Sequence, residues 1–99
     1  MSYSLRVNSQ NVLCVVGKID LTNVTAACSQ GRELINTLAT VRVDLSGVVQ
    51  ADSSILAMLI DWIRAAKTQQ KELVMSNLPS FLLDLGRVCG LDGILPISK

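Results

Sequence analysis

The chain lacks histidine altogether, and histidine is the side chain that most often serves as a general base near neutral pH. A serine nucleophile would therefore lack its usual activating partner, so a small serine hydrolase is the weakest functional interpretation. Clustered cysteines are missing as well, because Cys14, Cys28 and Cys89 lie far apart and form no Cys-x-x-Cys pair. Such a set predicts neither a metal site nor another cofactor. The odd count and wide spacing instead predict three small buried thiols in a reducing compartment.

Aromatic side chains and net charge are also scarce. Tyr3, Trp62 and Phe81 are the only aromatic residues, although 49% of the chain is hydrophobic, so the core must be built from Leu, Ile, Val and Ala. Nine Lys and Arg residues stand against eight Asp and Glu residues, and no basic run occurs. The chain has little excess positive charge to neutralise a phosphate backbone, which argues against nucleic acid as a partner.

Long hydrophobic runs are absent too. The longest apolar stretch, 55–63, is interrupted by Asp61 and falls well short of the roughly 20 residues that a membrane-spanning helix needs. The N-terminus alternates polar and apolar residues instead of opening with a basic segment and an apolar run, so no secretion signal is expected. These features predict a cytoplasmic protein that does not insert into the bilayer.

The spacing of the apolar residues predicts alternating strands and helices, and hence the α/β fold class. Helical spacing begins after Gly17, with Thr22 or Asn23 available as the N-cap. The middle of the chain reads as strand, helix, strand, for which a parallel crossover is expected. The predicted elements are a β-hairpin over 5–16, a helix over 24–38, a strand over 41–45, a helix over 53–68, a strand over 72–76, a helix over 80–89 and a short strand over 94–97.

The second predicted helix begins at a short polar turn, Asp52-Ser53-Ser54, which follows the strand over 41–45. Free backbone N–H groups at such a helix start favour an anion or a hydrogen-bond acceptor. Asp52 or Ser53 could also simply cap the helix, which would explain both residue types.

Helical spacing divides this helix into two sides. The predicted core stripe consists of Ile55, Leu59, Ile63 and Ala66, and the opposite side carries Ser53, Ala57, Asp61, Arg64 and Thr68. Met58 and Trp62 flank the core stripe, so the apolar arc is wider than one sheet face requires. Both side chains could pack beneath other helices or face a partner, and the sequence leaves these alternatives open.

Three segments of the chain resemble the STAS domain family, the fold of bacterial anti-sigma-factor antagonists. The first runs from Asp44-Leu45-Ser46 to the Asp52-Ser53-Ser54 turn, where Ile55 departs from the family's usual glycine. The second is Gly17-Lys18-Ile19-Asp20, which resembles the family's turn into the first helix. The third, 82–97, resembles its closing helix and last strand. The order and spacing of the three segments match those of the family over nearly the whole chain.

The resemblance implies a single STAS domain over residues 1–99. It implies a mixed sheet of four to five strands, with about three to four helices packed mainly on one face.

The resemblance also implies a non-enzymatic function. In the STAS subunits of Mla-type phospholipid-transport ABC complexes, the helix that bears this turn docks on the cytoplasmic ATPase, in a complex that contains a permease. That site maps onto Asp52, Ser53 and Ser54, and helical spacing extends it to Ala57, Asp61 and Arg64. The end of the chain soon after the last predicted strand resembles these subunits more than sporulation-type antagonists. The expected location is the cytoplasm, peripheral to the inner membrane.

The alternative implied by the resemblance is an anti-sigma-factor antagonist whose partner is an anti-sigma kinase. Ser53 matches the serine that the kinase phosphorylates in that family. A phosphate would add about −1.5 to −2 charges at the helix start, where N–H groups favour them, while Asp52 and any acidic partner surface would repel them. Release of the partner would be the expected result.

Overall fold

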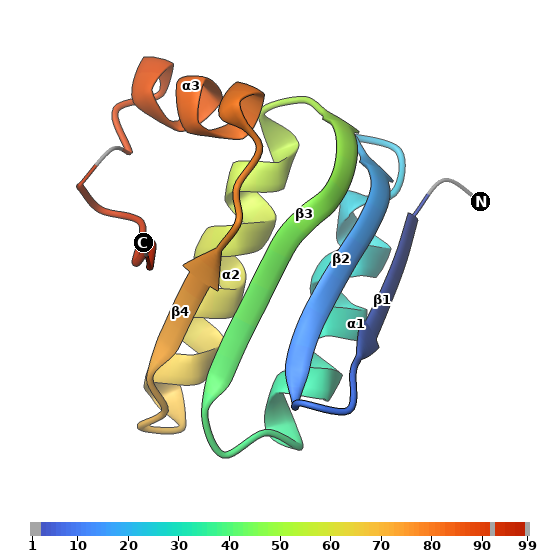
Figure 1. The fold of residues 1–99 in the computed structure, drawn as a ribbon, viewed down its shortest axis with the longest axis vertical. Helices are drawn as coiled ribbons and strands as arrows, with labels where there is room; N and C mark the ends of the chain where they lie inside the picture. Colours follow the sequence, from blue (N-terminus) through green and yellow to red (C-terminus); the bar gives the residue numbers. More distant parts are fainter. Residues whose placement is uncertain (1–2, 92, 99) are drawn as a thin grey trace.

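The computed structural model describes residues 3–91 and 93–98 as three helices and a four-stranded sheet (Figure 1). The elements in chain order are β1 (Tyr3–Val7), β2 (Val12–Ile19), α1 (Val24–Asn36), β3 (Val41–Ala51), α2 (Ser54–Thr68), β4 (Leu73–Ser76) and α3 (Ser80–Val88). The predicted fold class and the predicted ranges of strand and helix numbers are confirmed.

The strands are ordered β1-β2-β3-β4, with β1 antiparallel to β2 and the other neighbours parallel. Helices α1 and α2 lie behind the sheet in Figure 1, and α3 lies beyond the end of β4. Because β2, β3 and β4 are parallel, the turns that lead from them into helices leave from the same side. We call this side the C-terminal edge and the opposite side the N-terminal edge.

Helix α2 packs against α1 as well as against the sheet. Trp62 and Met58 are fully buried, and the Trp62 indole Nε1–H donates to the Cys28 carbonyl oxygen at 3.2 Å. The absence of a side chain at Gly31 makes room for the Trp62 ring. Ile63, expected in the core, is only half-buried because the contact with α1 turns the buried side of α2 toward Met58 and Trp62. Both of these large side chains therefore belong to the core.

Strand β3 is longer than predicted, since it runs to Ala51 instead of ending near residue 45. The composition of the stretch 44–47 is typical of a turn, which is why the sequence predicts that the strand ends there. The strand instead continues through β-bulges, where its register with β2 shifts. Within the first bulge, Asp44 Oδ1 accepts a hydrogen bond from the Ser46 backbone N–H at 2.8 Å. The turn-forming residues thus bend the strand without ending it.

The predicted last strand over 94–97 is reduced to one isolated parallel bridge between Met75 and Ile97. The Met75 N–H donates to the Pro96 carbonyl at 2.8 Å, and the Ser98 N–H donates to the Met75 carbonyl at 2.7 Å. Asp92, part of the closing motif, lies outside the described residues. The final segment therefore covers the edge of β4 without forming a full strand.

The three cysteines are free thiols, as their number and spacing predicted. Their predicted burial is wrong for Cys89, which is exposed because it lies past the last buried turn of α3, while Cys14 and Cys28 are half-buried. Burial, the largest influence, and the nearby Asp61 carboxylate raise the pKa of the Cys28 thiol.

Within the part of the chain that the structure describes, none of the helices combines the length and hydropathy of a bilayer-spanning segment.

Candidate functional site

The turn between β3 and α2 is organised by the Asp52 side chain. Asp52 Oδ1 accepts hydrogen bonds from the Ser54 backbone N–H at 2.9 Å and from the Ser54 hydroxyl. This geometry satisfies a backbone donor that a helix start leaves unpaired. The capping role that the sequence left open between Asp52 and Ser53 therefore belongs to Asp52.

Ser53 and Ser54 are neighbours with different environments. The Ser54 hydroxyl is half-buried and bonded to Asp52, whereas Ser53 is exposed and makes no side-chain capping bond. Ser53 already has helical backbone angles, φ −63° and ψ −15°, so its side chain lies at the tip of α2. The hydroxyl that the family resemblance singles out is available to a partner.

A second polar turn connects β2 to α1 and contains Asp20. Asp20 Oδ1 accepts from the Thr22 backbone N–H at 2.9 Å and from the Thr22 hydroxyl at 2.5 Å. Asn23, one of the two expected N-cap residues, occupies the N-cap position of α1, but its side chain makes no capping hydrogen bond. Asn23 Oδ1 accepts from the Asp20 N–H, and Asn23 Nδ2 donates to the Lys18 carbonyl, both at 2.9 Å. The side chain therefore holds the turn and does not cap the helix.

The two turns are joined at the C-terminal edge. Asp52 Oδ2 accepts a hydrogen bond from the Leu21 backbone N–H at 3.3 Å, and the Asp52 N–H donates to the Ile19 carbonyl at the same distance. Between the turns lies an open hollow of about 270 Å³, lined by Lys18, Ile19, Asp20, Gln50, Ala51 and Asp52. The Asp20 turn and the Asp52 turn, far apart in sequence, thus form one continuous surface.

Hydrogen bonding keeps the carboxylates of both turns ionised. The bonds from the Ser54 hydroxyl and N–H hold the pKa of Asp52 below its ordinary value. The bonds from the Thr22 hydroxyl and N–H lower the pKa of Asp20 in the same way, and the nearby Asp52 charge opposes that shift. At neutral pH the C-terminal edge therefore presents two carboxylates beside the neutral Ser53, and Lys18 lines the same hollow and favours the ionised form of Asp20.

The three outward residues predicted further along α2 have different surroundings. Ala57 and Arg64 are exposed, as helical spacing indicated. Asp61 is half-exposed and forms an ion pair with Arg32 of α1, with 2.6 Å between Oδ2 and Nη1. Sequence reasoning did not single out Arg32, because the relative rotation of two helices is set by packing between them.

The sequence also missed Leu21, which lies between the Asp20 turn and the start of α1 and is 78% exposed. An aliphatic residue inside an otherwise polar turn is the signal that could have found it.

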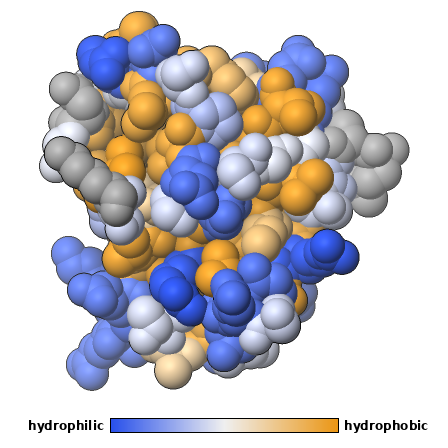
Figure 2. Space-filling view, viewed as in Figure 1, coloured by the Kyte–Doolittle hydropathy of each residue, from blue (hydrophilic) through white to orange (hydrophobic). Residues whose placement is uncertain are grey.

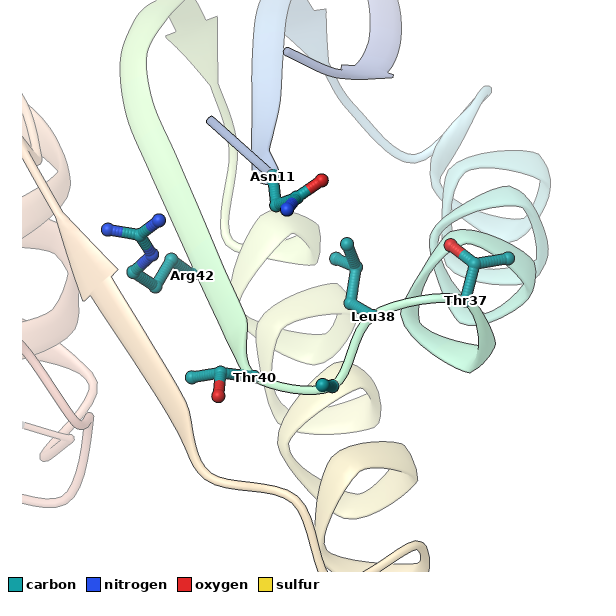
Figure 3. Close-up of a pocket in the computed structure, with 6 residues that line it drawn as sticks. Asn11, Thr37, Leu38, Thr40 and Arg42 are labelled. Atoms are coloured by element: carbon teal, nitrogen blue, oxygen red, sulfur yellow. The ribbon is translucent and has the colours of Figure 1, made fainter. Parts of the chain in front are cut away.

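The other end of the molecule carries a larger hollow, which contains none of the predicted site residues. Its volume is about 370 Å³, and its lining residues are Asn11, Thr37, Leu38, Ala39, Thr40 and Arg42. Figure 3 shows these residues coming from the end of the β1–β2 turn, the loop after α1 and the start of β3. The Arg42 guanidinium donates to the Gln10 carbonyl at 2.7 Å, which ties β3 to the hairpin.

Among residues 3–91 and 93–98, no group of three or more His, Cys, Asp or Glu side chains is placed to hold a metal ion.

The sheet face without helices mixes hydrophobic and hydrophilic side chains (Figure 2), as expected for a face in contact with water.

The mixed sheet, the helices on one of its faces and the exposed serine at the tip of α2 together define a small α/β domain of the STAS type. The chain belongs to the STAS domain family, because the family model described as "Mlab, STAS domain" matches residues 5–96. The family predicted from the three sequence motifs is therefore confirmed.

Solved structures agree with this assignment. A chain of the Acinetobacter MlaFEDB complex, in its ATP-bound Vtrans2 conformation, is 27% identical with a TM-score of 0.82, over 96% of this chain and 99% of that chain. The anti-sigma factor antagonist SpoIIAA in its unphosphorylated form is 13% identical with a TM-score of 0.73, over 99% of this chain and 89% of that one. At such low identity this second likeness shows the fold alone. No curated protein sequence matches the chain.

Proposed function

We propose that the chain is a non-enzymatic STAS subunit that binds and regulates or stabilises the cytoplasmic ATPase of a Mla-type phospholipid-transport ABC complex. Such a complex also contains a permease. In this role the chain is cytoplasmic and peripheral to the inner membrane, which it reaches through its partner. The family model and the 27% identical chain of the MlaFEDB complex support this assignment.

The exposed Ser53 hydroxyl at the tip of α2 is the observation that carries the proposal. The neighbouring polar groups of the turn bond to one another, so Ser53 can meet a partner without breaking an internal hydrogen bond. Ala57 is small and exposed one turn further along, which allows a close approach. Arg64 adds a charge beyond it. A few well-placed side chains of this kind are sufficient to anchor an interface.

Titration of the purified cognate ATPase with the chain tests the proposal. Ser53→Arg puts a long charged side chain into the docking surface, and we expect it to weaken binding by about tenfold or more. The matched control is Ser9→Arg, the same change at an exposed position in the hairpin turn of the N-terminal edge. Both variants should keep the wild-type melting temperature, because neither position belongs to the core. Equal binding by both variants would count against the site.

A second candidate function is an anti-sigma-factor antagonist switched by phosphorylation of Ser53. The same free hydroxyl favours it, since a kinase needs an accessible acceptor. The experiment is to incubate the chain with a cognate anti-sigma kinase and ATP and to measure its intact mass. A gain of about 80 Da, one phosphate, that disappears in Ser53→Ala would support the switch. No gain, together with tight binding to the ATPase, would leave the transporter role.

A further inference from the structure

Two of the most exposed aliphatic side chains flank, in sequence, the residues that line the hollow at the C-terminal edge. Leu21 is 78% exposed and directly follows Asp20, while Val49 is 75% exposed and directly precedes Gln50. A single exposed aliphatic residue is ordinary. Two of them on separate elements, each adjacent in sequence to a residue that lines the same hollow, form a pattern that a contact surface would explain.

Leu21 is held in a fixed turn. Its backbone N–H donates to Asp52, and the residues before and after it are bonded to each other through the side chains of Asp20 and Asn23. The Leu21 side chain therefore projects from a backbone with few alternative conformations. Such pre-organisation lowers the entropy cost of placing the side chain in a partner's pocket.

Val49, which is 75% exposed, lies at the second bulge in β3. Gly17 pairs with Val48 and Lys18 pairs with Gln50, so Val49 has no opposite residue in β2. Bulges of this kind re-aim side chains and are frequent beside functional sites. Val48, its neighbour, is buried.

We propose that Leu21 and Val49 are the apolar anchors of the contact with the ATPase, so that the docking surface includes the β2–α1 turn and the end of β3 in addition to the tip of α2. This inference rests on the proposed function. The complementary patch on the ATPase is apolar and bordered by at least one basic side chain, because Asp20 directly precedes Leu21, Asp52 accepts the Leu21 backbone N–H, and these two carboxylates outnumber Lys18 in the lining of the hollow.

The experiment is titration of the cognate ATPase with the double variant Leu21→Asn, Val49→Thr. Both changes keep side-chain size while removing apolar character. We expect binding to weaken by about tenfold or more, since buried aliphatic anchors carry much of an interface's affinity. Val88→Thr is the control, because it makes the same Val-to-Thr change at an 84% exposed position on α3, and it should bind like the wild type.

The outcomes separate this inference from the proposed function. Loss of binding in the double variant but not in Val88→Thr, with unchanged melting temperatures, supports the anchors. If Ser53→Arg abolishes binding while the double variant binds like the wild type, the anchors are wrong and the transporter role stands. If the wild type itself does not bind the ATPase, both fail. Wild-type affinity that does not fall with added salt would overturn the basic border.

Discussion

The two edges of the sheet use the same kind of turn in different ways. At the N-terminal edge, the Asn8 amide oxygen accepts from the backbone N–H groups of Gln10 and Val12, at 2.8 and 3.1 Å. At the C-terminal edge, the Asp52 carboxylate accepts from Ser54 and from Leu21. The first turn is neutral at every pH, whereas the second carries a charge that can titrate. Of these two turns, only the one at the C-terminal edge therefore has an organising side chain that can be protonated.

The edges also differ in how they treat the helix ends. At the N-terminal edge, the last carbonyls of α1, those of Ile35 and Asn36, accept hydrogen bonds from Lys71 Nζ at 2.9 and 3.2 Å. These helix-end acceptors are therefore bonded within the molecule. At the C-terminal edge, the Ser53 hydroxyl at the tip of α2 makes no capping hydrogen bond. The larger hollow lies at the N-terminal edge and the proposed site at the C-terminal edge. The hollow with the greater volume and the proposed docking residue therefore lie at opposite edges, so the proposal depends on the residues of the α2 tip and not on the size of a hollow.

The largest expected effect comes from removing the core that supports both edges. Leu59 is 1% exposed, and Leu59→Ala should lower the free energy of unfolding by about 2–5 kcal/mol. Urea unfolding followed by circular dichroism measures this loss. Leu83→Ala on α3, where the side chain is 39% exposed, is the control and should cost much less. A small loss for Leu59→Ala would mean that α2 is rotated differently.

A smaller loss should follow from crowding the contact between α1 and α2, the two helices that begin at the polar turns of the C-terminal edge. A Cβ at Gly31 would lie 2.1 Å from Trp62 Cε2, so Gly31→Ala should destabilise the protein by about 1–3 kcal/mol. Gly86→Ala is a matched control in α3, since its nearest atom, Leu95 Cδ1, would be at an ordinary 3.5 Å. Equal melting temperatures for the two variants would contradict the packing of Trp62.

The comparison of the two turns can be sharpened by pH. Asn8→Ala should cost about 1 kcal/mol of unfolding free energy at any pH, because the bonds it removes do not titrate. Asp52→Ala should destabilise the protein more near pH 6 than near pH 3. The pKa of Asp52 is lowered on folding, so its contribution is fully present above the unfolded value of about 3.9 and is lost as pH falls through the folded pKa.

Urea unfolding of both variants and the wild type at the two pH values checks this prediction. The same loss for Asp52→Ala at both pH values would show that its charge does not stabilise the turn.

The smallest stability effect is expected at the ion pair between Arg32 and Asp61. Both side chains are partly exposed, 46% and 32%, so Asp61→Asn should change the free energy of unfolding by only about 0.2–1 kcal/mol. If the docking surface continues along α2, the same variant should alter affinity for the ATPase more than it alters stability. A loss of stability above that range, with unchanged binding, would make Asp61 a purely structural residue.

Much of this fold could be predicted from the sequence because apolar periodicity reports directly on burial. The hairpin, the three helices and the parallel crossover all follow from local spacing. Local spacing could not show that β3 continues to Ala51, because the stretch 44–47 resembles a turn and only pairing with β2 keeps it extended. Nor could it show that Trp62 fills the space above Gly31, which depends on how two helices pack.

The candidate site was predictable in part. The Asp52-Ser53-Ser54 motif identified the turn. Which of the two serines bonds to Asp52 depends on hydrogen-bond geometry that the sequence does not contain. The contact between Leu21 and Asp52 joins residues far apart in the chain, so it appears only once β2 and β3 are paired.

The most direct test of the docking surface is photo-crosslinking in the intact transporter complex. A photoactivatable amino acid is placed at Ser53 or, as the matched control, at Ser9 on the opposite edge, and the crosslinked partner is identified by mass spectrometry. The proposed role predicts that position 53 crosslinks to the ATPase and that position 9 does not. Crosslinking to the ATPase from position 9 alone, or none from position 53, would contradict it.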